Sequence, residues 1–515
     1  MKRILLALAM ALFGYMFLSP HYLFPDGQGY YAYLPSLFFD GDLQLFNEFL
    51  YMRIPVPLAL TETGYISNNW QIGAALLWTP FFLLGKLFAT AGTHPHSAWF
   101  WFWVNFGTMF YGVLAVLLLF KLANTERLGS GTALCATACA LAGTPAFFYI
   151  FIMQSNAIGL TAFTSALFIW YWIASMKEPE RPQRYLLLGL TLGVAAMVRS
   201  QEVLLGLAPA TELLHRCIKK TVKMAPAARH ATLAVASFCI GFSPQLISWK
   251  VVNGSFFAAP AAFNLSWKNY ALDRVLFSPY HGILFWTPVY FIAAIGLVAG
   301  LRSKPLLSAG ALLVFAAQLF VNSCCAAFWE GHSFGLRQMT GLLPIVFLGV
   351  ARYLEYFAVK RTTLRCAGYG ILAASVLWTM GLTGGYFAGL DLQWPPTVVD
   401  LLTAEVNAVR VLPSLPGRLL GLQKIGLGWY SLMMLAALLL LWLGTGVLKS
   451  MEGKKAYLAL GTIVAVVLAY DITLAKAATN KPAYEIPREY TITQKQLDSY
   501  FMKLIEDTKR KYGIE

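Results

Sequence analysis

The sequence begins MKRILLALAMALFGYMFLSPHYLFPDGQGYYAY (residues 1–33), and this stretch decides the fold class. Its apolar run, residues 4–18, follows Lys2 and Arg3 and is not followed by a small-x-small cleavage site. We therefore interpret it as a retained first membrane span rather than a removed signal peptide. Asp26 comes soon after it. An ionisable group at the mouth of a span is costly unless it faces water or a partner, so Asp26 is the first candidate functional residue.

The whole chain has the composition of a membrane protein. Of its 515 residues, 58% are hydrophobic and only 12% are charged, whereas an average soluble domain has about 25% charged residues. The net charge of +15 is expected of a protein whose cytoplasmic loops collect Lys and Arg. We expect no nucleic-acid partner, because no basic patch interleaved with aromatic residues lies in a soluble segment. The seven cysteines match neither a disulfide framework nor a zinc-binding spacing.

Apolar segments of membrane-spanning length recur along the chain, since a span needs about 20 residues to cross roughly 30 Å of hydrocarbon. Two segments are ambiguous. Residues 70–88 are punctuated by glycine and proline, and residues 185–214 are too long for one span and are interrupted by the polar residues 199–202. The clear expected spans are 4–19, 99–120, 131–152, 156–175, 231–249, 283–301, 306–323, 341–358, 366–387, 428–448 and 457–475.

The distribution of basic residues chooses between two topologies. Six basic connections, at 121–127, 177–184, 216–229, 302–304, 360–365 and 449–455, share one side of the membrane under two conditions: 70–88 re-enters or lies at the interface, and 185–214 is a hairpin of two short helices. Making 70–88 a true span and 185–214 a single helix leaves two basic loops outside. We therefore prefer the first arrangement and predict an all-α polytopic membrane protein with about 13 spans.

Two regions are expected. Residues 1–475 form a transmembrane catalytic domain, whose first outer loop, 20–98, carries interfacial helices. Residues 476–515 form a short polar tail, partly amphipathic and placed on the outer side. The same topology puts the chemically interesting side chains on the outer face.

The first outer loop is rich in residues suited to sugars and cations. Tyr30 and Tyr31 offer rings with polar tips for binding a sugar, although tyrosines also collect at membrane interfaces for other reasons. Asp40 and Asp42 are possible ligands of a divalent cation, but clustered acids in a loop are more often solvated. No cofactor is certain.

Arg337 is the main candidate for binding a phosphate. It lies just before an apolar run, where a guanidinium matches phosphate oxygens bidentately; the alternative is an arginine anchored to lipid headgroups. His332 and Arg199 are further candidates for the same role, although Arg199 and Glu202 can instead pair with each other. The remaining candidates for substrate contact are Asn68, Asn69, His281, Trp329 and Glu330.

Taken together, these residues resemble a known family. The order is a span, an outer loop that opens with Asp26 and is rich in tyrosine, a segment that skirts the membrane, many spans, and a late outer motif containing His332 and Arg337. It is similar to the GT-C superfamily of polyprenyl-phosphate-sugar-dependent glycosyltransferases, in the branch of protein O-mannosyltransferases and the lipid A aminoarabinose transferase. The chain departs from that pattern where Gln154-Ser155-Asn156 replaces a frequent charged pair. It also has only a short tail at the C-terminus.

The resemblance implies a membrane glycosyltransferase in which Asp26 is the general base. The implied partners are a polyprenyl-phosphate-sugar donor, a lipid, glycan or protein acceptor, and membrane lipid. Because the phosphate leaves as a stable anion, one base and a cationic group suffice, and direct displacement inverts the anomeric centre. The expected location is the bacterial inner membrane, with the site on its outer face.

Three other functions remain open at this point. A transporter or flippase also has many interrupted spans, but it commonly has repeated halves and polar groups near the bilayer midplane, and neither pattern is evident here. A glycan ligase or polymerase that uses lipid-linked sugars is the second alternative, and a structural membrane subunit is the third.

Overall fold

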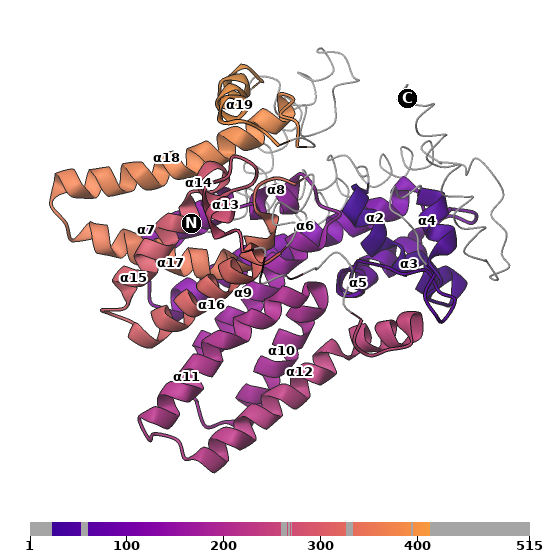
Figure 1. Cartoon of the computed structure of the whole chain (residues 1–515), viewed down its shortest axis with the longest axis horizontal. Coiled ribbons are helices and arrows are strands. Elements are labelled where there is room, and N and C mark those ends of the chain that lie inside the picture. The colour runs from indigo at the N-terminus through magenta and orange to yellow at the C-terminus, as the bar shows by residue number, and fades with distance from the viewer. Residues whose placement is uncertain are drawn as a thin grey trace, which may run out of the picture.

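The structure is a computed structural model that describes residues 23–52, 60–258, 265, 268, 270–325, 333–392 and 395–411. Its regular elements within these ranges are helices (Figure 1). Two isolated β-bridges occur between the helices. Six helices are long and apolar enough to cross a membrane, and four shorter apolar helices accompany them. The predicted all-α polytopic class is therefore confirmed. The expected spans 4–19, 428–448 and 457–475 and the tail 476–515 lie outside the described residues.

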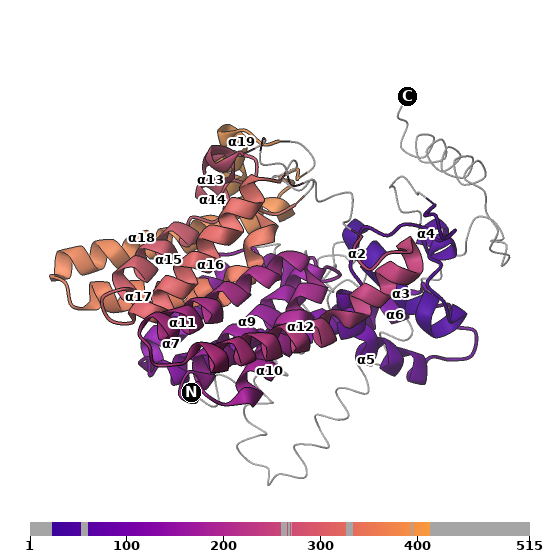
Figure 2. The same cartoon turned by 60° about the horizontal axis from the view of Figure 1, so that its bottom comes forward.

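The first outer loop contains a series of short helices, as the sequence predicts. They are α2 (Pro25–Tyr31), α3 (Tyr33–Pro35), a π-helix (Ser36–Asp40) and α4 (Phe46–Met52). Figures 1 and 2 show α2, α3 and α4 grouped at one end of the molecule. The ambiguous segment 70–88 forms α5 (Gly73–Phe88), whose 16 residues extend about 24 Å, less than the roughly 30 Å of a hydrocarbon layer.

Most of the expected spans within the described residues are continuous helices. The first outer loop leads into α6 (Ala98–Thr125), and Trp78 of α5 donates a hydrogen bond of 2.8 Å to Thr108 on α6. The other long helices are α9 (Ala157–Ser175), α12 (Met224–Asn253), α16 (Pro305–Ser323), α17 (Leu343–Ala358) and α18 (Thr362–Phe387). A helix beyond these spans, α19 (Val398–Val411), packs on α18.

The segment 185–214 is a helical hairpin, as expected from its basic flanks. α10 (Pro182–Val198) is followed by a 3-10 turn (Ser200–Gly206) and by α11 (Leu207–Ile218). α10 lies directly against α12, because a Cβ on Gly189 would stand 2.0 Å from the carbonyl oxygen of Ala234. Small residues at such a contact let two backbones approach, which is how helices gain van der Waals energy inside a membrane.

Two spans expected to be continuous are broken. Residues 131–152 form α7 (Ser130–Ala142) and α8 (Ala146–Phe151), and residues 283–301 form α14 (Ile283–Trp286) and α15 (Val289–Gly300). Each break precedes a proline, Pro145 or Pro288, which lacks the donor that a continuous helix needs. The hydroxyl of Thr379 on α18 lies 2.9 Å from the carbonyl oxygen of Trp286 and 3.5 Å from that of Gly143. Since a hydroxyl group has a single proton to donate, this threonine satisfies the nearer carbonyl, that of Trp286, at the second break.

Ion pairs link pairs of the basic connections to each other. They lie at the opposite end of the bundle from Asn156, Arg199 and Arg337. Arg352 on α17 pairs with Glu126, which lies 3.5 Å from Lys304. Arg216 pairs with Glu180 across two other connections. These contacts agree with the expectation that such loops share one face of the membrane.

A buried ion pair fastens the hairpin at the same end. Arg184 of α10 donates bidentately to Glu212 of α11 at 2.9 and 2.5 Å. Both side chains are almost fully buried, and Trp172 on α9 donates a third bond to Glu212 at 2.9 Å. Because the two charges compensate each other only as a pair, removing one leaves the other buried without a counter-charge.

We expect Arg184→Met to lower the free energy of unfolding by about 3–5 kcal/mol, because Glu212 would be left in the interior without its counter-charge. Reversible unfolding in mixed micelles measures the change. The double variant Arg184→Met/Glu212→Leu should recover most of the loss, and a double variant as unstable as the single one would contradict this explanation.

Candidate active site

Helix α2 places Asp26 by two close contacts of its backbone. The N–H of Phe24 donates to the hydroxyl of Ser155 at 2.9 Å. A Cβ on Gly27 would lie 2.0 Å from the carbonyl oxygen of Ser155, and one on Gly29 would lie 2.0 Å from the Trp70 ring. The glycines beside Asp26 are thus needed for space, and α2 is pressed between the loop before α9 and the segment before α5.

Asp26 and Arg337 form an ion pair. Nη1 of Arg337 lies 2.5 Å from Oδ2 of Asp26, and the two side chains are 16% and 32% exposed. The sequence places both residues on the outer face, and the structure places them in direct contact. A short, charge-assisted bond of this kind, partly shielded from water, is among the stronger hydrogen bonds in proteins.

The chain turns sharply to present Arg337. Gly335 has a φ of +60°, a left-handed conformation that glycine adopts without strain. Arg337 then begins a 3-10 helix (Arg337–Leu342) that leads into α17, and its carbonyl accepts a bond of 2.8 Å from the hydroxyl of Thr340.

Arg199 adds a second positive charge. It ends α10 in an extended conformation and is largely buried. Burial by itself raises the pKa of Asp26, but the charge and hydrogen bond of Arg337, a hydrogen bond from Trp70 and the charge of Arg199 outweigh it and lower that pKa below its usual value. The carboxyl group is therefore ionised at neutral pH, beside two guanidinium groups.

Asn156 is a site residue that the sequence analysis did not select. Its Oδ1 accepts a bond of 3.1 Å from the N–H of Ile158 and caps α9, and its Nδ2 lies 3.5 Å from Oδ2 of Asp26. The segment Gln154-Ser155-Asn156 is thus a wall of the Asp26 site. In the sequence, this segment could have been recognised as three polar residues between two apolar runs.

The other selected residues lie in different surroundings. Asn68 supports α2, because its Nδ2 donates to the carbonyl of Gly29 at 3.1 Å, while Asn69 is exposed. The Tyr30 ring lies edge-on to Trp78, 6.4 Å between centroids. Tyr31 is fully buried and donates a hydrogen bond to the carbonyl of Pro95, so it is a core residue of this loop.

His281 lies behind the turn that presents Arg337. It is buried, has a left-handed φ of +66°, and its Nδ1 is 3.3 Å from the hydroxyl of Ser333. Trp329, Glu330 and His332 lie outside the described residues.

Asp40 and Asp42 bind groups of their own loop. Oδ1 of Asp42 accepts bonds of 3.0 Å from the Ser36 hydroxyl and from the N–H of Gln44, and Asp40 accepts one of 2.8 Å from Asn47. In the part of the chain that the structure describes, no group of three or more His, Cys, Asp or Glu residues is arranged to hold a metal ion. A role for these two aspartates in cation binding stays a prediction.

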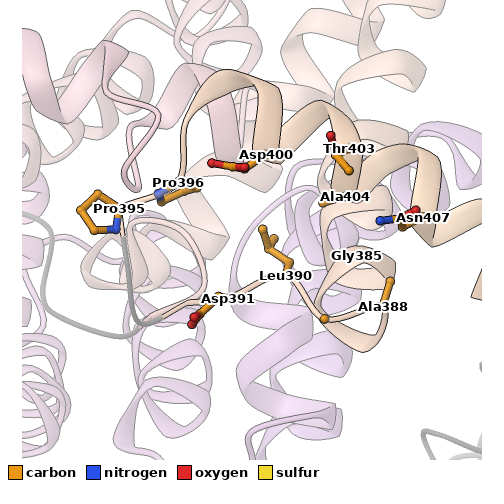
Figure 3. Close-up of a pocket in the computed structure, with 11 residues that line it drawn as sticks. Gly385, Ala388, Leu390, Asp391, Pro395, Pro396, Asp400, Thr403, Ala404 and Asn407 are labelled. Atoms are coloured by element: carbon orange, nitrogen blue, oxygen red, sulfur yellow. The ribbon is translucent and has the colours of Figure 1, made fainter.

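Two cavities lie in other parts of the described structure. An apolar one of about 450 Å³ lies between α10, α11 and α12 and begins at Val203 and Gly206, just after Arg199. Another, of about 340 Å³, lies between the end of α18 and α19, where Asp391, Asp400 and Asn407 line it (Figure 3). Leu392, Leu401 and Ala404, which lie along the same two segments, share a hydrophobic cluster with Phe334, next to the turn before Arg337.

Comparison with known proteins finds one family to which part of the chain is similar. Residues 100–249 match the family described as dolichyl-phosphate-mannose-protein mannosyltransferase. The match covers 150 of the 515 residues of the chain. The matched segment contains Asn156 and Arg199, and it ends before Arg337. No curated protein sequence matches the chain at a significant level.

Two solved structures are similar to this chain. They are the crystal structures of ArnT from Cupriavidus metallidurans bound to undecaprenyl phosphate and in the apo state. Each is 14% identical, with a TM-score of 0.45, and each comparison covers 82% of this chain and 77% of the other.

We expect Arg337→Met to raise the pKa of Asp26, because burial then acts against the ionised carboxylate with only Trp70 and Arg199 opposing it. The ¹³C signal of the Asp26 carboxyl, assigned by its absence in Asp26→Asn, measures this change in a pH titration. Arg274→Met removes an exposed arginine on another outer segment and should leave the titration unchanged. A titration curve that stays in place in Arg337→Met would contradict the ion pair.

Proposed function

We propose that the protein transfers a sugar from a polyprenyl-phosphate-linked donor to an acceptor hydroxyl at the outer face of a bacterial inner membrane, with Asp26 as general base. The observation that carries the proposal is the contact between the Asp26 carboxylate and the Arg337 guanidinium, with Arg199 near them. The family that residues 100–249 match is described as one acting with a dolichyl-phosphate sugar, which is also a polyprenyl-phosphate donor.

The charges at the site suit a phosphate leaving group. Arg337 and Arg199 together carry two positive charges against the single negative charge of Asp26, so the cluster has a net charge that favours an anion. The donor phosphate leaves as a stable anion and needs cationic stabilisation rather than protonation. The acceptor hydroxyl is a poor nucleophile and needs a base, which is the role given to Asp26. A single displacement of this kind inverts the anomeric centre.

Donor binding also prepares the base in this mechanism. In the unloaded site Arg337 lowers the pKa of Asp26 and makes it a weak base. When the donor phosphate engages Arg337, the carboxylate loses its strongest partner, and burial then raises its pKa toward the range useful for accepting a proton. Asp26 thereby becomes an effective base only when a donor is present to react.

An apolar cavity is available to bind the hydrocarbon part of the donor. The apolar cavity between α10, α11 and α12 begins four residues after Arg199 and is lined by Leu188, Leu192, Leu213 and Phe238, among others. A polyprenyl chain entering laterally from the membrane into this cavity would carry its phosphate toward Arg199. The sugar and the acceptor are not part of the proposal.

We expect Asp26→Asn in reconstituted protein to reduce sugar transfer from a polyprenyl-phosphate donor by about 10²–10⁴-fold, the usual contribution of a general base. Donor affinity should stay the same or increase, because the partner that competes for Arg337 is removed. Transfer to a lipid, glycan or protein acceptor is measured by the amount of polyprenyl phosphate released.

The matched control is Asp273→Asn, which removes an exposed aspartate of another outer segment and should keep wild-type turnover. Unchanged turnover in Asp26→Asn would sink the catalytic assignment. Movement of the intact donor across the bilayer without cleavage of its phosphate–sugar bond would instead favour a flippase.

For Arg337→Met we expect donor affinity to fall by about 10–100-fold, since a charge-assisted hydrogen bond contributes about 1.5–3 kcal/mol. Isothermal titration with a polyprenyl phosphate in micelles measures the affinity. A variant that binds as well as wild type would show that Arg337 serves only to pair with Asp26.

A further inference from the structure

Glu202, on which the charge of Arg199 acts, is a carboxyl group that the proposed mechanism does not use. Glu202 belongs to the 3-10 turn between α10 and α11, three residues after Arg199, and is fully buried. Neither of its carboxyl oxygens has a hydrogen-bond partner among the described residues. A buried carboxyl without hydrogen-bond partners is costly, particularly in its ionised form.

Glu202 touches the helix that carries Arg337. A Cβ on Gly341 would lie 2.2 Å from both of its carboxyl oxygens, so the carboxyl packs against the backbone of that 3-10 helix. The neighbouring Gln201 fastens the same contact: its Nε2 donates to the carbonyl of Gln338 at 2.6 Å and to the side chain of Gln318 at 2.8 Å. The turn containing Arg199 and the helix starting at Arg337 are therefore held together around Glu202.

Few charged groups surround this carboxyl. Arg199 acts on it from the end of α10, Arg337 begins the helix that it touches, and Tyr290 of α15 lies within its electrostatic reach. Glu212, further along α11, is engaged by Arg184. Helices α9 and α16, which also pack on this turn, contain no Asp, Glu, Lys, Arg or His.

We propose that Glu202 is a positioning residue that sets how much positive charge Arg199 offers to the donor phosphate. As a neutral acid, it does not offset the positive charge of Arg199, which remains available to bind the ligand. As an anion, it draws the Arg199 charge toward the interior and repels the phosphate. The proposal deepens the proposed function and rests on it.

The protonation state of Glu202 agrees with this arrangement. Burial raises its pKa to about 8, against the opposing charge of Arg199. The acid is therefore neutral at pH 6.5 and becomes ionised as the pH rises through about 8. The change adds one negative charge within the electrostatic reach of Arg199, so donor affinity should decrease in the same range.

The test measures the affinity of a short-chain polyprenyl phosphate without sugar for the full-length protein in micelles, from pH 6.5 to 9.5. In wild type we expect affinity to fall on the order of tenfold across this range, as the added charge opposes phosphate binding. Glu202→Gln, which keeps the shape and removes the titration, should match wild type at pH 6.5 and show no such fall.

The control is Glu405→Gln on α19, since Glu405 also has a pKa raised by burial, to about 7, but is not part of the arginine cluster. It should keep the wild-type pH profile, whereas a role of buried carboxyls in general stability would affect both variants. If Glu202→Gln does not fold, Glu202→Met serves in its place, with the same expected flat profile.

The outcomes separate the two proposals. A wild-type affinity that does not change with pH, or an alkaline fall that persists in Glu202→Gln, would overturn the role of Glu202 while leaving the proposed function intact. Absence of polyprenyl phosphate binding in every variant at every pH would overturn the proposed function itself.

Discussion

The ion pair between Asp26 and Arg337 is the interaction on which the arrangement of the site depends. It joins segments 311 residues apart in the sequence, one in the first outer loop and one in the 3-10 helix before α17. Each charge is partly shielded from water and is stabilised by the other. The surrounding contacts place the two partners: α2 is pressed on Ser155 and Trp70, and Arg337 follows the left-handed turn at Gly335.

A polar lattice of side-chain amides supports this pair from behind. Gln71 bonds to Ser200, Gln245 on α12 accepts the N–H of Ile72, and Gln201 connects with Gln318 and Gln338. Each bond joins elements far apart in the chain. Amides are suited to this position because they satisfy both donors and acceptors without adding charge. The net charge of the site is therefore set by its arginines and carboxyl groups alone.

The sequence predicts the fold well where the signal is local and less well where it depends on distant partners. Apolar length and basic flanks indicate the spans and the α10–α11 hairpin. The breaks at Pro145 and Pro288 were not predicted, because apolar length alone defined these spans and the prolines within them were not counted as breaks. For the site, counting basic loops brought Asp26, Arg199 and Arg337 to one face, and the structure places them together. Asn156 was passed over because its role comes from a neighbour 130 positions away. Tyr31, expected to touch substrate, is instead buried, since an aromatic loop also builds its own core.

The glycine contacts of α2 decide which side of the site can adjust. With Gly27 on the Ser155 backbone and Gly29 on the Trp70 ring, the helix has no space to shift toward either neighbour. Arg337, by contrast, reaches Asp26 through a long side chain with several rotatable bonds. The carboxylate is therefore the fixed side of this ion pair, and the guanidinium is its adjustable side. Any group that approaches the pair meets a carboxylate held in place by backbone contacts, whereas the guanidinium can change its rotamer.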